Sequence, residues 1–405
     1  MAGLAALTLA YVMSQFYRSF LAVLTPALIS ELGATKGELS SASGAWFAGF
    51  AIAQILVGVS LDRYGPRLTA AVILALCGGG GALLFALATA PWMIIAAMAL
   101  IGVGCAPVLM SATFIFAHTY SPARLSFLIS WYIGIGSLGI VVGASPLAAA
   151  AEALGWRVVL LLLAAVTVLV ALCIVVFVRD PQVEKHEDDA GGLSGYMQLL
   201  KIRELWPIIP LIGLNYAPAI GIRGMWAGPY LADIYGADAL LIGHATLVIS
   251  IATVAGAFVY GPLDSFFGTR KWVSVVGNVL SVLVLAWLAL QPAGGLWQAT
   301  LLMAALGLLG NSFGVLMAHG RAFIPPHLTG RGITLLNLFS IGLVGLAQFA
   351  SGPVFYAANG ESLERGYSVL FAYFGVLVVV ALVAYLFSRD VRPERPRDEV
   401  SAEAR

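Results

Sequence analysis

Twelve apolar segments, each long enough to cross a lipid bilayer, recur along this 405-residue chain. A helix of about 20 mostly apolar residues spans the hydrocarbon core of a bilayer, which is about 30 Å thick. The segments occupy residues 4–28, 39–60, 68–89, 91–116, 125–148 and 157–178, and then 207–231, 240–262, 272–291, 297–318, 332–357 and 367–388. The sequence therefore predicts an all-α membrane protein with twelve transmembrane helices.

The composition excludes several other classes of protein. Hydrophobic residues make up 60% of the chain and charged residues only 10%, which is more apolar surface than a soluble globular protein can bury. The net charge of +1 gives no electrostatic reason to expect nucleic acid as a partner. Cys77, Cys105 and Cys173 lie in separate apolar segments, so we interpret them as core residues rather than disulfide partners or metal ligands. We expect no metal and no cofactor.

The chain divides into two halves of six segments each. The longest polar interruption, residues 180–204, separates them. We predict an N-terminal six-helix bundle (1–179), a cytoplasmic linker (180–204), a C-terminal six-helix bundle (205–390) and a charged, proline-containing tail (391–405) that is disordered and cytoplasmic. The start of the chain lacks a basic region followed by a cleavage site, so we expect the first segment to be a retained span.

The basic residues predict the orientation of the spans. With both termini placed inside, 16 of the 21 lysines and arginines fall on that side, and only Lys36, Arg157 and Arg365 fall outside. Because short cytoplasmic loops carry an excess of basic residues, we expect both termini in the cytoplasm and the protein in a bacterial inner (plasma) membrane. The remaining two basic residues, Arg18 and Arg223, lie inside spans.

The two halves repeat each other at an offset of about 200 residues. Corresponding positions carry GVSLDRYGPR (58–67) and GPLDSFFGTRK (261–271), AH at 117–118 and 318–319, and RD at 179–180 and 389–390. Arg18 in the first span corresponds to Arg223 in the seventh, and each follows a tyrosine by seven residues, Tyr11 or Tyr216. Together these matches predict two related, pseudo-symmetric bundles.

The arrangement resembles the major facilitator superfamily of transporters. Its features are six plus six spans, a central inside loop and the motif G-x-x-x-D-R-x-G-x-R after the second span, here Gly58, Asp62, Arg63, Gly65 and Arg67. The second copy keeps Asp264 and Arg270 but has Ser265 in place of the first arginine. The resemblance implies transport by alternating access and no enzymatic activity.

Three stretches are similar to a narrower group, the organophosphate:phosphate antiporters and related sugar-phosphate permeases. They are YRSFLAVLTPAL (17–28), HTYSPAR (118–124) and RGMWAGPYLAD (223–233). In that group one arginine from each of the first and seventh spans holds the substrate phosphate, and Arg18 and Arg223 match those positions. The further cations of that group have no counterpart here, because the second span lacks Lys and Arg and the fifth lacks His. The resemblance therefore implies an anion site without fixing its specificity as phosphate.

The depth of the two arginines supports the same hypothesis. Arg18 lies about 11 residues, or roughly 16 Å at the helical rise, from the outer end of its span. An arginine near mid-bilayer costs about 2.5–3.5 kcal/mol even on mild scales. No Asp or Glu lies at comparable depth, so two unpaired guanidiniums would offer planar donor forks to a phosphate or carboxylate. Alternatively, each arginine donates to backbone carbonyls of a broken helix, because NYAPAIGIRGMWAGP (215–229) contains two prolines and three glycines.

Neighbouring polar and aromatic side chains are candidate second contacts for the substrate. They are Tyr11 and Gln15 on the stripe of Arg18, Tyr216 and Trp226 on that of Arg223, Trp131 in the fifth span and Asn337 in the eleventh. For the aromatic residues, bundle packing or an interfacial belt is an equally good interpretation. Gly136, Gly139 and Gly143 predict a face of the fifth span for close helix contact.

The loop motif predicts a conformational gate formed by Gly58, Asp62, Arg63, Gly65, Arg67, Asp264 and Arg270. A carboxylate at a helix junction accepts from the free N–H groups of a neighbouring helix start. The resemblance implies that Asp62 joins the two bundles near residues 329–334 when the inside is closed. A cluster that only sets topology would explain Arg63 and Arg67 but not Asp62.

The absence of a membrane-embedded carboxylate argues against a built-in proton relay or sodium site. We therefore expect a monomeric secondary transporter of a small organic anion, phosphorylated or carboxylated. It would work by exchange for a counter-anion such as phosphate or a carboxylate, or by symport of a proton on the substrate. Facilitated diffusion, a multidrug-type efflux carrier and a transport-dead receptor of the same fold stay open as alternatives.

Overall fold

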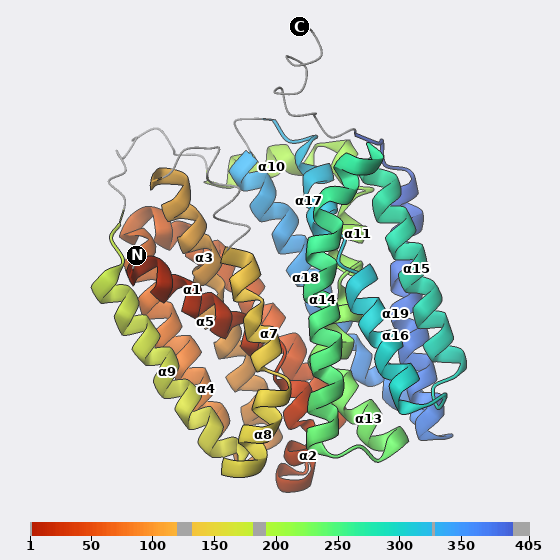
Figure 1. Cartoon of the computed structure of the whole chain (residues 1–405). Helices are drawn as coiled ribbons and strands as arrows, with labels where there is room; N and C mark the ends of the chain where they lie inside the picture. The colour runs from red at the N-terminus through yellow and green to blue at the C-terminus, as the bar shows by residue number, and fades with distance from the viewer. Residues whose placement is uncertain (1, 120–131, 181–191, 326–328, 392–405) are drawn as a thin grey trace, which may run out of the picture.

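The computed structural model describes residues 2–119, 132–180, 192–325 and 329–391, and these ranges contain helices and no strands (Figure 1). Trp131, residues 181–191 of the predicted linker and the predicted tail beyond residue 391 lie outside the described residues. The two halves form two groups of helices that stand side by side, coloured red to yellow and green to blue in Figure 1.

The N-terminal half contains a bent first span, followed by long helices. Its elements are α1 (Ala2–Tyr17), α2 (Leu21–Leu32), α3 (Lys36–Ile73), the π-helix η1 (Leu74–Gly79), α4 (Gly80–Ala86), α5 (Pro91–Thr119), α7 (Leu138–Val142), α8 (Ser145–Leu154) and α9 (Trp156–Phe177). Helix α3 covers the predicted second span and continues through a kink at Gly65, whose φ of 80° is a conformation that favours glycine.

The C-terminal half follows a short helix, α10 (Gly192–Leu200), at the end of the molecule where the linker runs. Its elements are η2 (Arg203–Leu205), α11 (Ile209–Leu214), α12 (Ala217–Gly221), the π-helix η3 (Ile222–Trp226), α13 (Ala227–Tyr235), α14 (Ala239–Phe267), α15 (Arg270–Leu290), α16 (Leu296–Leu309), α17 (Phe313–Arg321), α18 (Thr329–Asn359) and α19 (Leu363–Leu386). The seventh span thus consists of several short pieces, α11 to α13, where the prolines and glycines predicted a break.

Among the described residues, nine helices are long and apolar enough to cross a membrane, and two bent helix pairs raise the number to eleven. The bent pairs are α1 with α2, at 51°, and Tyr132–Val142 with α8, at 41°. The part of α3 before Gly65 lies where a twelfth span is predicted. The all-α, multi-pass membrane fold is confirmed, and the number twelve stays a prediction.

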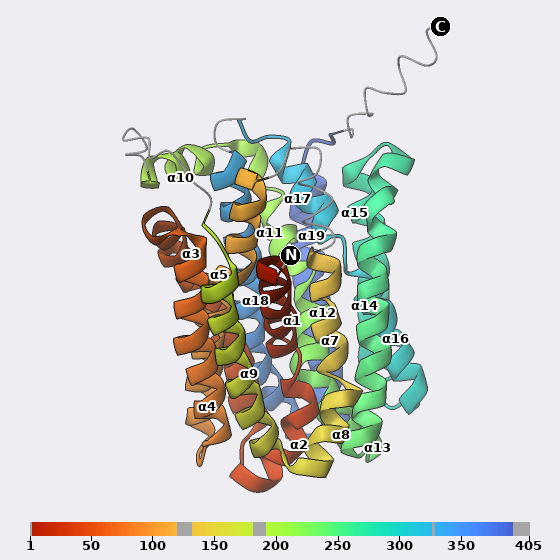
Figure 2. The same ribbon diagram turned by 60° about the vertical axis from the view of Figure 1, so that its left-hand side comes forward.

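The two ends of the molecule differ in how the halves meet. We call the end that carries α10 and the Gly65 kink the linker end, and the opposite end, with the tips of α2, α8 and α13, the far end (Figures 1 and 2). At the far end Ser40 Oγ lies 2.6 Å from the Gln348 carbonyl oxygen and 2.8 Å from Ser351 Oγ. Lys36 forms an ion pair with Asp233 at the same end.

Close backbone contact reinforces this closure. A Cβ atom on Gly228 of α13 would overlap the Ala22 carbonyl oxygen of α2, and one on Gly345 would lie 3.0 Å from Phe47 Cβ. Every hydrogen bond between described residues of opposite halves joins residues 36–40 to residues 233–356. The structure therefore has the two bundles joined at the far end.

Candidate functional site

Arg18 lies at the break of the first span. Helix α1 ends at Tyr17 and α2 begins at Leu21, so Arg18 is the first residue of the bend. Next to it, Ser19 Oγ lies 3.3 Å from the Gln15 carbonyl oxygen and 3.2 Å from that of Phe16. No proline or glycine occurs from Arg18 to Phe20, so the sequence carries none of the usual signals of a kink at this position.

Aromatic rings of α3 surround the Arg18 guanidinium. Its Cζ atom lies 4.9 Å from the ring centroid of Trp46, 5.8 Å from that of Phe50 and 6.0 Å from that of Phe47. Arg18 is half-buried, and its Nε atom has no hydrogen-bond partner among the described residues. The charge is thus stabilised by ring faces while its donor atoms stay uncommitted.

Arg223 occupies the π-helical turn η3 in the middle of the broken seventh span. Its side chain is only 2% exposed; the Tyr216 hydroxyl is a hydrogen-bonding neighbour, but none of the three guanidinium nitrogens makes a well-aligned hydrogen bond to a described residue. Insertions of π-helix within α-helices are frequent at functional sites. A buried cation without a partner is costly, so Arg223 is the most strongly unsatisfied group of the chain's described part.

The two arginines come from opposite bundles and lie next to each other. A Cβ atom on Gly224 would lie 3.1 Å from the Arg18 carbonyl oxygen, so the backbones meet at this level. Arg223 interacts electrostatically with both Arg18 and Tyr216, and Tyr11 interacts with Arg18 and Tyr216. The structure thus brings together four residues that the sequence repeat singled out.

No acidic side chain among the described residues forms an ion pair with Arg18 or Arg223. The ion pairs among described residues are Lys36–Asp233, Arg157–Glu31, Arg270–Asp264 and Arg365–Glu361. None of these described ion pairs includes Arg18 or Arg223. Arg18 Nε and the three guanidinium nitrogens of Arg223 make no hydrogen bond to a described backbone carbonyl, so the described contacts give no support to the alternative based on broken-helix carbonyls.

The candidate second contacts do not all lie near the arginines. The Tyr11 ring stacks on Tyr132 with centroids 4.9 Å apart, and Gln15 Nε2 lies 3.5 Å from Tyr11 Oη. Gln15 Oε1 is buried without a described partner, which leaves one free acceptor near Arg18. Trp226 instead belongs to the far-end closure, because its Nε1 donates 2.9 Å to Ser351 Oγ.

Of the remaining two candidates, the structure describes only Asn337. Asn337 of α18 is half-buried and has no hydrogen bond to the described residues, and Trp131 lies outside the described residues. The glycine face of the fifth span does pack closely, as predicted: a Cβ on Gly136 would overlap the Tyr11 ring, and one on Gly139 would overlap the Val12 carbonyl oxygen. Figure 2 shows α1 and α7 side by side at this contact.

The predicted gate is only partly described in the N-terminal half. The side chains of Asp62 and Arg63 and part of the region 329–334 lie outside the described residues, so their contact across the bundles stays a prediction. A Cβ atom on Gly58 would have no neighbour within 4 Å. Gly65, with its positive φ, forms the kink in α3. The Arg67 backbone N–H donates 2.8 Å to Asp180 Oδ1, which ties the end of the sixth span to the start of the third.

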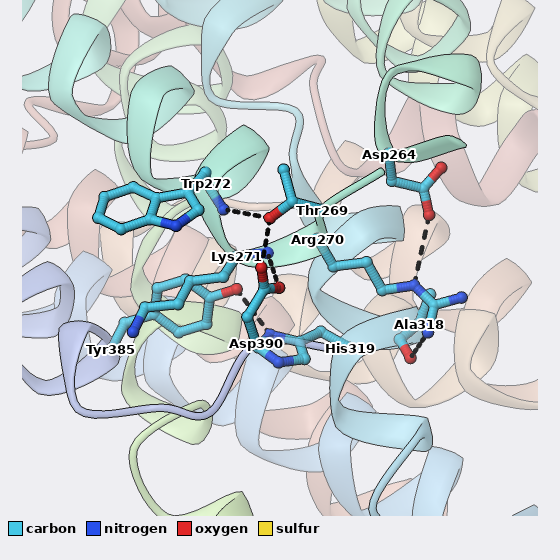
Figure 3. A network of polar contacts seen from close by, with 9 residues as sticks. All are labelled: Asp264, Thr269, Arg270, Lys271, Trp272, Ala318, His319, Tyr385 and Asp390. Atoms are coloured by element: carbon cyan, nitrogen blue, oxygen red, sulfur yellow. Dashed lines mark hydrogen bonds and ion pairs between the residues drawn. The ribbon is translucent and has the colours of Figure 1, made fainter. Parts of the chain in front are cut away.

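The C-terminal copy of the predicted gate motif makes several contacts within its own half of the chain (Figure 3). Arg270 Nε lies 3.4 Å from Asp264 Oδ2, and its Nη1 lies 3.4 Å from the Ala318 carbonyl oxygen. Asp390 accepts hydrogen bonds of 2.6 Å from Thr269 Oγ1 and 3.1 Å from the Lys271 backbone N–H. Partial burial raises the pKa of the Asp390 carboxyl, but these hydrogen bonds outweigh burial and the pKa lies below its ordinary value.

The two RD dipeptides therefore have one structural role. Asp180 accepts from the backbone at the start of the third span, and Asp390 does so at the start of the ninth. His319, the histidine of the second AH dipeptide, is bonded on both ring nitrogens, to Tyr385 Oη at 2.7 Å and to the Arg389 carbonyl oxygen at 2.8 Å (Figure 3). These contacts hold helices together and leave no free group for a substrate.

Sequence reasoning missed the residues that surround Arg18 and close the far end. Trp46 and Phe50 are spaced by four residues on an apolar helix, a pattern that is shared with ordinary core residues. Ser40 and Ser351 pair across 311 positions of sequence, and Tyr367 Oη donates 2.6 Å to Asp233, the partner of Lys36. No local pattern could have predicted these pairings.

Comparison with known proteins places the fold and the family. A family model described as Major Facilitator Superfamily matches residues 7–225, which is more than half of the chain. The chain is 24% identical over 442 aligned positions to a hexuronate transporter of Escherichia coli (strain K12), covering 99% of this chain and 95% of that protein. It is 23% identical to a protein of Cupriavidus necator named probable sulfoacetate transporter, covering 99% and 96%.

Solved structures show the same fold. A bacterial homologue of the human lysosomal transporter Spinster, in an inward-facing and unoccupied conformation, superposes with a TM-score of 0.76 at 16% identity, covering 97% of this chain and 98% of that one. The described helices therefore have the arrangement seen in this transporter.

Proposed function

The chain belongs to the major facilitator superfamily of transporters, and we propose that it moves a small organic anion across the membrane by alternating access. The observation that carries this proposal is the pair Arg18 and Arg223, one from each half of the chain, with no ion pair to a described carboxylate. Arg223 in particular is 2% exposed, and none of its three guanidinium nitrogens makes a well-aligned hydrogen bond to a described residue.

A bound anion would remove the cost of this arrangement. An arginine in the middle of a membrane protein costs about 2.5–3.5 kcal/mol when nothing compensates it. Each guanidinium offers a planar donor fork that matches a carboxylate, sulfonate or phosphate. Since the two forks belong to different bundles, a single anion between them would join the bundles at mid-membrane.

The named relatives support a carboxylate- or sulfonate-bearing substrate. A hexuronate is a sugar acid with one carboxylate, and sulfoacetate carries a carboxylate and a sulfonate. Both names denote anions, although at 24% and 23% identity they do not specify which anion this chain prefers. We propose organic acids as the first class to test and phosphate esters as the second.

The transport cycle follows from the closed far end. The substrate would reach the arginines from the linker end, which we place in the cytoplasm, and neutralise them before the bundles swing. The swing must break Lys36–Asp233 and the Ser40–Ser351 contact. In exchange, a second anion would bind the arginines on the other side of the membrane, and the carrier would return with that anion bound. In symport, a proton bound to the substrate's own acid group would cross the membrane together with the substrate.

Ligand binding to purified protein tests the anion site directly. Thermal-shift titrations compare pairs that differ in charge: glucuronate with glucose, sulfoacetate with acetamide, and glycerol phosphate with glycerol. We expect stabilisation only by anions. Arg18→Ala and Arg223→Ala should abolish it, whereas Arg157→Ala, which removes an exposed ion pair with Glu31, should not. Retained anion binding in both arginine variants would refute the anion site.

Uptake into proteoliposomes separates a carrier from a receptor. An anion that binds in the titration is added outside the proteoliposomes, and its uptake is measured with and without the same anion trapped inside them. Acceleration by trapped anion supports exchange, and dependence on an inward proton gradient supports symport. Binding without uptake would favour the receptor alternative, and uptake of lipophilic cations in place of anions would favour the efflux alternative.

A further inference from the structure

The environment of Arg18 contains a feature that the anion site by itself does not require. Three aromatic rings of α3 lie within 6.0 Å of its Cζ, and Trp46 is the nearest at 4.9 Å. Trp46 is 1% exposed and stacks on Phe50 with centroids 5.2 Å apart. These rings form a rigid apolar wall, which we call the α3 platform (Trp46, Phe47 and Phe50).

The platform has no counterpart at the second arginine. No described aromatic ring lies over Arg223 in a cation–π arrangement, although the sequence repeat aligns Arg223 with Arg18. At the offset of 202 residues that relates Asp62 to Asp264 on the same spans, Trp46 corresponds to Val248, a half-buried aliphatic residue. The repeat thus preserves the cation but not the rings beneath it.

We propose that Trp46 is a positioning residue of the transporter: its ring face holds the Arg18 guanidinium in place for the anion. This inference rests on the proposed function. A ring attracts the guanidinium through its electron-rich face, whereas the guanidinium donates hydrogen bonds along its edges. The platform can therefore restrict Arg18 without competing for its donors, and an aligned donor loses less conformational entropy when the anion arrives.

The location of the platform adds a second consequence. Trp46 and Arg18 belong to the same bundle, and rocking of bundles as rigid bodies keeps groups within one bundle together. Arg18 therefore keeps its orientation at every stage of the cycle. Arg223 approaches and withdraws with the other bundle, so the platform should affect the affinity for the anion and not the rate of the swing.

Kinetics of uptake test this division of roles. We expect Trp46→Leu to raise KM for the transported anion about tenfold and to leave the maximal rate within about twofold, consistent with the strength of a buried cation–π contact. Trp46→Phe keeps a ring face but loses the indole N–H, and it should raise KM less than about threefold. Phe50→Leu should raise KM about twofold and carries the test if Trp46→Leu does not reach the membrane.

The matched control is Trp156→Leu. Trp156 is also buried, at 3% exposure, and its indole nitrogen also lacks a described partner, but it lies over Arg157 rather than Arg18. This variant should lower thermal stability as Trp46→Leu does, with KM unchanged. A general packing effect would instead change KM in both variants.

Two results would overturn the inference. If Trp46→Phe raises KM as much as Trp46→Leu, the ring face is not what matters. That result would mean that the indole N–H, which has no described partner, contacts the anion itself. Unchanged KM in Trp46→Leu and Phe50→Leu, while Arg18→Ala abolishes uptake, would mean that Arg18 needs no platform. If Arg18→Ala transports normally, the proposed function fails, and that outcome is distinct from both.

Discussion

Arg18 and Arg223 occupy matching positions of the sequence repeat but opposite kinds of environment. Arg18 is half-buried at a helix break, with Trp46 at 4.9 Å from its Cζ. Arg223 is 2% exposed in a π-helical turn, with no hydrogen bond from its three guanidinium nitrogens to described residues. Arg18 thus contacts aromatic rings of its own half of the chain, whereas Arg223 has no aromatic ring over it among the described residues.

The carboxylates at the ends of the two bundles behave differently from the arginines. Asp180 and Asp390 make the same contact in both halves, a hydrogen bond from the backbone at the start of the third or ninth span. The carboxylate contacts of Asp180 and Asp390 are thus the same in both halves of the repeat. The surroundings of Arg18 and Arg223 differ between the halves.

The largest expected difference between the two arginines concerns replacement by lysine. Arg223→Lys should lower kcat/KM for uptake about 100-fold, because a lysine offers no planar fork and Arg223 has no other support. Arg18→Lys should lower it only about tenfold, because an ammonium keeps the attraction of the platform. Proteoliposome uptake measures both. Equal losses would show that the two cations contribute in the same way.

The stability of the ligand-free protein should change in opposite directions. Arg223→Met removes an uncompensated buried charge and should stabilise the protein by about 2 kcal/mol. Arg18→Met removes a cation that the platform stabilises, and should destabilise it by about 1 kcal/mol. Thermal unfolding in detergent without anion measures the sign. Destabilisation by Arg223→Met would indicate a partner for Arg223 that the described residues do not reveal.

The closed far end can be weakened without touching either arginine. Lys36→Met leaves Asp233 without its cation and should shift the equilibrium toward far-end opening by about 1 kcal/mol. The labelling rate of Ala34→Cys, a buried far-end position, in a background without native cysteines reports this opening. Arg365→Met is the control, because its pair with Glu361 is exposed and lies within one bundle. Unchanged labelling would mean that the ion pair does not hold the closure.

The smallest effects should come from the symmetric carboxylates. Asp180→Ala and Asp390→Ala should each cost about 1 kcal/mol of stability, similar to loss of a helix cap. The folded Asp390 has a pKa below its ordinary value, so its ionised form stabilises the protein above the ordinary pKa. This contribution is lost as the pH falls through the lowered folded pKa. Thermal unfolding from pH 7 to pH 3 should therefore show a smaller acid loss in Asp390→Ala than in the unaltered protein.

Sequence reasoning predicted much of the fold because a bilayer imposes simple rules on each span. The apolar segments match the described helices, and the prolines and glycines around Arg223 predicted a broken seventh span. The break at Arg18 was not predictable, since it contains neither proline nor glycine. The position of Trp226 was not predictable either. In the sequence of an apolar helix, an aromatic residue that packs against other helices cannot be told from one that lines a binding site.

The sequence by itself determined which charges enter the membrane. Arg18 and Arg223 occur one in each half, and no carboxylate lies at their depth in the sequence. Charged side chains are rare at this depth because burying a charge in lipid is costly. Only the tertiary structure decided what surrounds them: the platform over Arg18, the free nitrogens of Arg223 and the closure of the far end. These depend on pairs such as Ser40 with Ser351, which lie hundreds of residues apart and meet only when whole helices pack.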